Sequence, residues 1–83
     1  MTLTDMSMRE LVLYIATSLV DNPGTVEVSQ ADAEKAIILE LRVSDADRGK
    51  VIGKEGRIIK SIRTLVNTAA TKCDKRAVVE IVE

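Results

Sequence analysis

The sequence contains no histidine, tryptophan or phenylalanine, and it has a single cysteine, Cys73, and a single aromatic residue, Tyr14. Without histidine, the chain has no catalytic triad, no cysteine–histidine pair and no zinc cluster. One cysteine cannot form a disulfide framework, so we expect the reducing cytoplasm as the compartment. The missing Phe and Trp argue against RNA-binding modules that stack bases on aromatic rings. The composition therefore points away from an enzyme, a metal site or a bound cofactor.

Long hydrophobic runs are also absent. The longest strictly apolar stretch, residues 11–16, is far shorter than the ~20 residues of a membrane-spanning helix. No targeting segment is expected either, because the N-terminus lacks a basic region. The 83 residues, 46% apolar and 30% charged, instead predict one small globular domain over residues 1–83. A net charge of −1, taken as an average, argues against a nucleic-acid ligand.

Helical and strand patterns follow one another along the chain. Residues 7–20 predict an amphipathic helix that begins with a capping box, in which Ser7 precedes Glu10 by three positions. Residues 25–30 and 35–43 alternate apolar and polar side chains and predict two strands. The remaining predicted elements are a short helix over 46–52, a longer helix over 57–72 and a last strand over 76–82.

The apolar positions show which faces of these elements are buried. In the second strand Ile37, Leu39, Leu41 and Val43 share one face. In the last strand Glu80 must face water, which places Ala77, Val79 and Ile81 inward. The apolar stripe of the longer helix consists of Ile58 or Ile59, then Ile62, Leu65, Val66, Ala69 and Ala70.

The order of elements predicts the fold class. Two helices lie between the last two strands, so these strands are expected to be parallel, whereas the first two form an antiparallel hairpin. The prediction is an α+β domain with the order α-β-β-α-α-β, in which a three-stranded mixed sheet carries three helices on one face.

A glycine-rich segment, Gly53-Lys54-Glu55-Gly56, joins the two later helices. Such a loop presents backbone N–H groups and a helix N-terminus to an anion, and its glycines let a sugar-phosphate backbone approach closely. Lys54 and Arg57 lie at the N-terminus of the longer helix, where the helix dipole disfavours a cation by about 0.3–1 kcal/mol. Phosphates bound at this end would explain the two cations. The simpler interpretation is that Gly53 ends one helix and Gly56 makes a turn.

Spacing excludes other phosphate loops. A P-loop needs four residues between its glycines and a Ser or Thr after the lysine, whereas three residues separate Gly49 from Gly53, and Glu55 follows Lys54. No G-x-G-x-x-G motif follows a strand, so a dinucleotide fold is not indicated.

The run VIGKEGRII, residues 51–59, resembles the V-I-G-x-x-G-x-x-I signature of KH domains, which clamp about four nucleotides of single-stranded nucleic acid with a GXXG loop. The order of elements resembles the type II arrangement of that fold. Over essentially the whole chain, the segments LVDNPGTVEV, GKVIGKEGR and KRAVVEIVE are similar to the small bacterial single-KH proteins of the KhpA type. The chain is thereby identified as a member of this family.

The resemblance implies how single-stranded RNA is bound. The loop residues Gly53, Lys54, Glu55 and Gly56 contact phosphates, and an aliphatic groove takes the place of aromatic rings for the bases. Val43 fits either this groove or the core, and Glu55 offsets part of the attraction of Lys54, which predicts weak and modestly selective binding. The other RNA-binding candidates are Val51, Ile52, Arg57, Ile59 and Lys60, with Arg48, Lys50 and Arg63 as peripheral charges.

Positive charge is concentrated around this loop. Residues 48–63 hold six basic residues and one acidic residue, a local net charge of +5, and because the whole chain carries −1 the remainder carries −6. A solvated helix face is the simpler interpretation of such a run. Its coincidence with the glycine loop favours nucleic acid, since contact depends on local potential. We expect RNA binding to weaken steeply with salt.

The resemblance further implies a non-catalytic RNA chaperone or post-transcriptional regulator that forms homodimers, pairs with a larger Jag-type (KhpB) KH protein and is linked to cell-envelope and cell-length control. The alternative is a protein-interaction module that uses the fold mainly for assembly. Outward apolar residues of the sheet, Ile38, Val78 and Val82, support it. Tyr14, off the main helical stripe, is either a partner contact or simply half-exposed, and Cys73 is expected to be partly buried.

Overall fold

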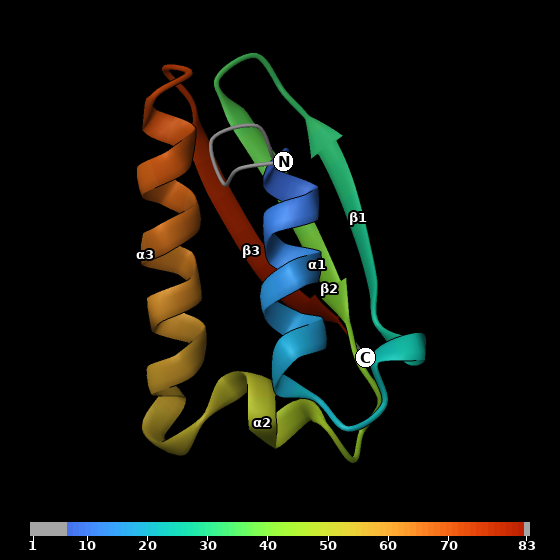
Figure 1. The fold of residues 1–83 in the computed structure, drawn as a ribbon. Coiled ribbons are helices and arrows are strands. Elements are labelled where there is room, and N and C mark those ends of the chain that lie inside the picture. The colour runs from blue at the N-terminus through green and yellow to red at the C-terminus, as the bar shows by residue number, and fades with distance from the viewer. Residues whose placement is uncertain (1–6, 83) are drawn as a thin grey trace.

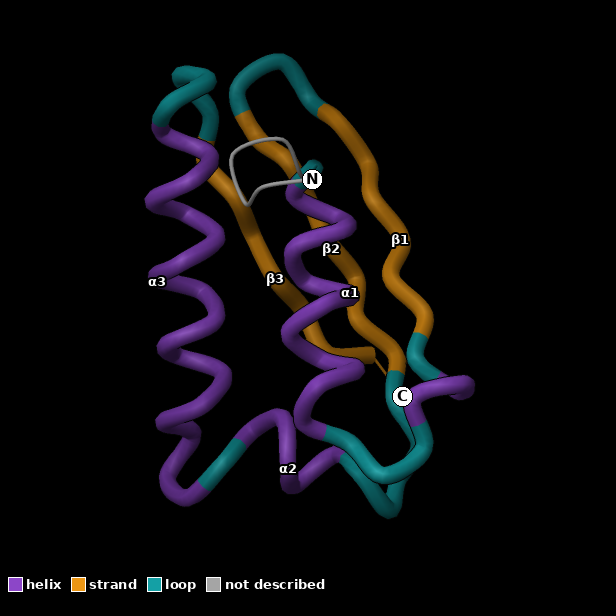
Figure 2. The backbone as a smooth tube through the Cα atoms, viewed as in Figure 1, coloured by secondary structure: helices purple, strands orange, loops and turns teal. Residues whose placement is uncertain are grey.

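The computed structural model describes residues 7–82, which form one sheet with helices packed on one of its faces (Figures 1 and 2). The predicted α-β-β-α-α-β order is confirmed. In chain order the elements are α1 (Met8–Leu19), a 3₁₀ turn η2 (Pro23–Thr25), β1 (Glu27–Asp32), β2 (Ala36–Arg42), α2 (Arg48–Ile52), a 3₁₀ turn η3 (Lys54–Gly56), α3 (Arg57–Thr71) and β3 (Arg76–Val82). None of the helices in residues 7–82 is long and apolar enough to cross a membrane.

The sheet is mixed, as predicted, with the strand order β1-β2-β3. β1 and β2 are antiparallel, with Val28 opposite Leu41. β2 and β3 are parallel, with Leu39 opposite Val79, because the chain crosses over through α2 and α3 between them. The two longer helices, α1 and α3, lie side by side over one face of the sheet, and α2 closes the end of this helical layer (Figure 1).

The hydrophobic core lies between the sheet and α1 and α3. Leu39 and Leu41 of β2 and Val66 of α3 are fully buried, and each such side chain stabilises the fold by about 1.5–3 kcal/mol relative to its exposed state. Val43, just beyond β2, is also buried, so it belongs to the core rather than to a groove. Ile81, predicted to point inward, is half-buried and packs against the core from the end of β3.

Element boundaries differ from the predictions where turns hold the chain. The first strand begins at Glu27 instead of residue 25, because Pro23–Thr25 form a 3₁₀ turn in which the Thr25 N–H donates to the Asn22 carbonyl at 3.0 Å. The helix expected from residue 46 begins at Arg48. The predicted cap of α1 is confirmed, since Ser7 Oγ accepts a hydrogen bond from the Glu10 N–H at 3.1 Å.

Two burial predictions are wrong. Leu65 of the predicted apolar stripe is 51% exposed, because the outer rim of α3 faces the groove beside α1 and nothing in residues 7–82 covers it. Cys73 is exposed rather than partly buried, because it lies in the turn after α3 has left the sheet.

Candidate nucleic-acid interface

The loop between α2 and α3 depends on two left-handed glycines. Gly53 has φ +77° and Gly56 has φ +74°, a region that side chains with a Cβ rarely adopt. A Cβ on Gly53 would lie only 2.6 Å from Ile58 Cγ1, whereas a Cβ on Gly56 would meet nothing nearer than 3.9 Å. The first glycine is therefore required by its backbone angle and by close packing, the second by its backbone angle alone.

Backbone hydrogen bonds hold the loop in a tight turn. The Gly53 N–H donates to the Gly49 carbonyl at 2.9 Å and ends α2, and the Gly56 N–H donates to the Gly53 carbonyl at 3.1 Å. Glu55 is also left-handed, with φ +58°, which costs a non-glycine residue about 1–2 kcal/mol. Lys54 and Glu55, in this turn, are both exposed.

The N-terminus of α3 carries no side-chain cap. Its N-cap residue is Gly56, which makes no side-chain hydrogen bond to the first turn. A Ser or Asp in this position would compete with an incoming anion for those N–H groups. The Arg57 N–H donates to the Lys54 carbonyl, but no side chain blocks the positive end of the helix dipole, which can attract a phosphate.

Three exposed cations surround this helix end, namely Lys54, Arg57 and Lys60. Glu55 pairs with Arg57, whose Nη2 lies 3.5 Å from Glu55 Oε2, rather than with Lys54. Both partners are largely exposed, so this ion pair is worth about 0–1 kcal/mol and is easily exchanged for a phosphate. Lys54 and Lys60 form no ion pair within residues 7–82.

Two of the peripheral candidates are engaged with acidic residues near α2. Arg48 Nη2 lies 3.4 Å from Asp45 Oδ1. Lys50 Nζ forms an ion pair with Asp21 and lies 3.5 Å from Asp47 Oδ1. The hydrogen bond to Asp21 raises the pKa of Lys50, although partial burial opposes this shift.

The third peripheral candidate, Arg63, is directed to the sheet. Its Nε donates to the Val79 carbonyl at 3.1 Å, and one turn later the Asn67 Oδ1 accepts a hydrogen bond from the Ala77 N–H at 2.9 Å. Both side chains of α3 thus cover the open edge of β3. The positive charge available to a ligand is therefore concentrated at the loop and the first turn of α3.

The aliphatic candidates divide between core and surface. The resemblance implied that Val51 and Ile59 line a groove for the bases. Both side chains are buried, so they belong to the core. Ile52 and Ile58 are half-buried and flank the loop. Ile58, which packs against Gly53, was not among the predicted site residues.

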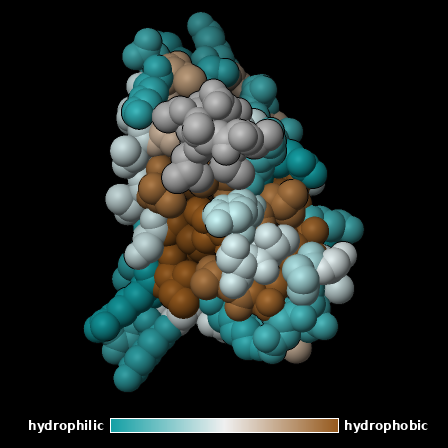
Figure 3. Space-filling view, in the orientation of Figure 1, coloured by the Kyte–Doolittle hydropathy of each residue, from teal (hydrophilic) through white to brown (hydrophobic). Residues whose placement is uncertain are grey.

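An apolar groove leads away from the loop between α1 and α3. It has a volume of about 380 Å³ and appears as the hydrophobic surface at the centre of Figure 3. Leu65, 51% exposed, lies on its rim, and Tyr14 on α1 is 59% exposed. The lining residues are Ile15, Leu19, Arg57, Ile58, Ser61, Ile62 and Leu65.

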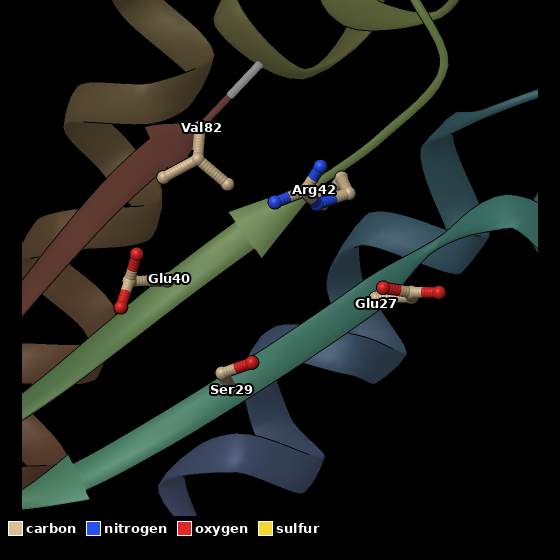
Figure 4. A pocket seen from close by; sticks show the side chains of 5 residues that line it. All are labelled: Glu27, Ser29, Glu40, Arg42 and Val82. Carbon is tan, nitrogen blue, oxygen red and sulfur yellow. The ribbon is translucent and has the colours of Figure 1, made fainter.

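A second depression, of about 300 Å³, lies on the sheet face that the helices leave open (Figure 4). Glu27 of β1 lies directly opposite Arg42 of β2, and Glu40 follows on the same face. The two carboxylates make this depression unsuitable for a phosphate. Within residues 7–82, no group of His, Cys, Asp and Glu side chains could hold a metal ion.

Comparisons with known proteins show which family the chain resembles. Residues 9–81 match the family model described as "KhpA/KhpB, KH domain". Relatives named "RNA-binding protein KhpA" include those of Clostridium perfringens, 59% identical over 90% of this chain and all of the relative, and of Clostridium acetobutylicum, 56% identical with the same coverage. The Aquifex aeolicus relative of the same name is 43% identical over 93% of this chain and 98% of its own. No solved structure gives a significant match. The chain belongs to the KhpA/KhpB KH-domain family.

Proposed function

We propose that this chain binds single-stranded RNA and clamps its sugar-phosphate backbone at the loop Gly53–Gly56. The observation that carries the proposal is the uncapped N-terminus of α3, which two left-handed glycines open and three exposed cations surround. Relatives covering nine-tenths of the chain are named as RNA-binding proteins, and the family is not known for enzymatic activity.

The cations at the loop determine how strongly binding depends on salt. Lys54, Arg57 and Lys60 are placed to contact about three phosphates. For single strands, the logarithm of the affinity falls with the logarithm of the salt concentration at about 0.7 per phosphate, which gives a slope of about −2. Between 50 and 200 mM salt, affinity should therefore fall roughly 20-fold.

Aliphatic side chains beside the loop serve the bases. Ile52 and Ile58 are half-buried next to Gly53, and the buried Val51 and Ile59 support them from the core. Such a surface provides van der Waals contact without the aromatic stacking that other RNA-binding modules use. We therefore expect modest base selectivity.

The test is a double substitution of the loop, Lys54→Asp with Glu55→Asp, measured by fluorescence anisotropy with a short labelled single-stranded RNA. Its control is Lys35→Asp, which changes the net charge equally but lies in the turn between β1 and β2, at the opposite end of the molecule (Figure 1). An acidic residue at position 54 suits the helix N-terminus, so the fold is expected to survive.

The proposal predicts that the loop variant loses RNA binding and that Lys35→Asp retains it. Equal weakening in both variants would show that binding follows overall charge and not the loop. Retained binding in the loop variant would overturn the clamp.

A second candidate function is protein assembly, favoured by the exposure of Leu65 on the rim of the apolar groove between α1 and α3. We propose that this groove contacts a second copy of the chain, or a larger KH protein of the KhpB type. The family name joins KhpA and KhpB. Sedimentation of the wild type and of Leu65→Asp tests self-association, and identical monomeric behaviour of both would exclude the homodimer.

In the cell, we propose that the protein acts in the cytoplasm as an RNA chaperone or post-transcriptional regulator. Crosslinking in cells, followed by sequencing of the bound RNA, tests this role, and absence of enriched transcripts would contradict it. Links to cell-envelope and cell-length control remain expectations from the resemblance.

A further inference from the structure

Asp47 is a buried charged residue near the start of α2, only 1% exposed. Its Oδ1 accepts a hydrogen bond from the Asp21 N–H at 3.2 Å, and its Oδ2 accepts three bonds: from the Asn22 N–H at 3.0 Å, from Asn22 Nδ2 at 3.0 Å and from Ser44 Oγ at 3.1 Å. Lys50 Nζ lies 3.5 Å from Oδ1. The carboxylate is therefore almost completely satisfied.

These contacts join the segment after α1 to residues 44–50, which lie about 25 positions later in the sequence. Asp21 and Asn22 follow α1, Ser44 follows β2, and Lys50 belongs to α2. Burial alone would raise the pKa of Asp47, but the hydrogen bonds from Asn22, Asp21 and Ser44 outweigh it and lower the pKa to about 2. Asp47 is thus charged at any physiological pH, and an ionised carboxylate holds the segment after α1 against the start of α2.

α2 needs such external support. It has five residues, far fewer than the ~12–15 that a helix requires for stability of its own. Three contacts fix it: Val51 is fully buried in the core, Asp47 anchors the N-terminal end, and Lys50 pairs with Asp21 after α1. The glycine loop begins directly at the other end, with Gly53. From Asp47 to Gly53 the chain rises by about 9 Å if it is helical throughout.

We propose that Asp47 is a positioning residue for the RNA-binding loop: it fixes α2 against the end of α1 and so presents Gly53–Gly56 in the geometry that receives phosphate. This inference rests on the proposed function of the loop. Asp47 is only 1% exposed, so it acts on a ligand through the loop and not by direct contact. Its effect on affinity is preorganisation, since a loop already in its bound geometry has less freedom to lose on binding.

The experiment compares Asp47→Asn, which keeps the size but removes the charge and one acceptor, with Val28→Ala in β1. Val28 is buried in β1, opposite Leu41 of β2, and truncating it lowers stability at a site that shares no hydrogen bond with Asp47. Both variants are measured under buffer and temperature conditions in which circular dichroism shows them to be fully folded. The readouts are the Kd for a short single-stranded RNA at several salt concentrations and the hydrogen exchange of the Gly53 and Gly56 amides, which donate to Gly49 and Gly53.

Asp47→Asn should weaken RNA binding about fivefold or more with an unchanged salt slope, and it should accelerate amide exchange at Gly53 and Gly56. Val28→Ala should change neither. If Asp47→Asn does not fold, Asn22→Ala, which removes only the Nδ2 donor, should show the same effects to a smaller degree.

Unchanged affinity and unchanged loop exchange in the folded variant would overturn the inference, as would equal effects in Val28→Ala. The proposed function fails separately, if the loop substitution Lys54→Asp with Glu55→Asp leaves wild-type affinity intact. The exchange measurement needs no RNA and decides the positioning role in that case as well.

Discussion

Replacing each loop glycine by alanine should have clearly different effects on stability. At Gly53, φ is +77° and ψ is 171°, and the new Cβ would lie 2.6 Å from Cγ1 and 2.9 Å from Cβ and Cδ1 of Ile58. At Gly56, φ is +74°, but the nearest atoms lie 3.9 Å away. Only the first substitution therefore adds a steric clash to the backbone strain.

The size of the difference follows from three contributions. At Gly56, with ψ 16°, the left-handed backbone costs an alanine about 1–2 kcal/mol, and at Gly53, with ψ 171°, the backbone costs it about 1–3 kcal/mol. Alanine restricts the unfolded chain, which offsets about 0.4–1 kcal/mol of this. Overpacking against Ile58 adds about 1–3 kcal/mol at position 53. We expect Gly53→Ala to lower the free energy of unfolding by about 2–4 kcal/mol, and Gly56→Ala by about 1 kcal/mol.

Urea unfolding followed by far-ultraviolet circular dichroism measures both values, since the chain has no tryptophan and a single tyrosine. A double-mutant cycle with Ile58→Ala measures most of the clash, because this substitution removes Cγ1 and Cδ1 and leaves only Cβ, 2.9 Å away. Gly53→Ala should then cost at least about 1 kcal/mol less in the Ile58→Ala background than in the wild type.

Equal destabilisation by the two glycine substitutions, or a strictly additive cycle, would refute this reasoning. The first result would mean that the backbone angle alone determines the glycine requirement. The second would mean that the chain near Ile58 shifts freely to accommodate the new methyl group.

Two further predictions concern burial and pH. Leu39→Ala should lower the free energy of unfolding by about 2–5 kcal/mol, because Leu39 is fully buried. Leu65→Ala, at a half-exposed site, should lower it by less than about 1 kcal/mol. Urea titration measures both free energies. The pKa of Asp47, about 2, lies below its ordinary value of 3.8, so its stabilising effect is complete above pH 4 and is lost as the pH falls through 2. The difference in unfolding free energy between the wild type and Asp47→Asn should therefore shrink from pH 4 to pH 2, and a constant difference would contradict this assignment.

The sequence predicted the elements of the fold well, because their signals are local. The alternation around Leu39 and Leu41 defined both the strand and its buried face, and the Ser7–Glu10 spacing marked the start of α1. The parallel pairing of β2 and β3 followed from the two intervening helices. The predicted ends of elements were less accurate. At residues 25–26 a turn that begins at Pro23 replaced the first residues of the predicted strand.

The candidate site was predicted only in part. The glycine spacing identified the loop, and counting charges located the basic segment. The sequence could not separate Lys54 and Lys60, which are free of ion pairs within residues 7–82, from Lys50, which pairs with Asp21 from a different part of the chain.

What the sequence by itself determined was the periodic pattern of apolar residues, the order of elements and the loop between two glycines, since each depends on residues a few positions apart. The tertiary structure decided which side chains remain available. It placed Val51 and Ile59 in the core, directed Arg63 to the edge of β3, exposed Leu65 and brought Asp47 within hydrogen-bond distance of Asn22, 25 positions away. These outcomes depend on which faces of distant elements meet, and a one-dimensional pattern does not contain that information.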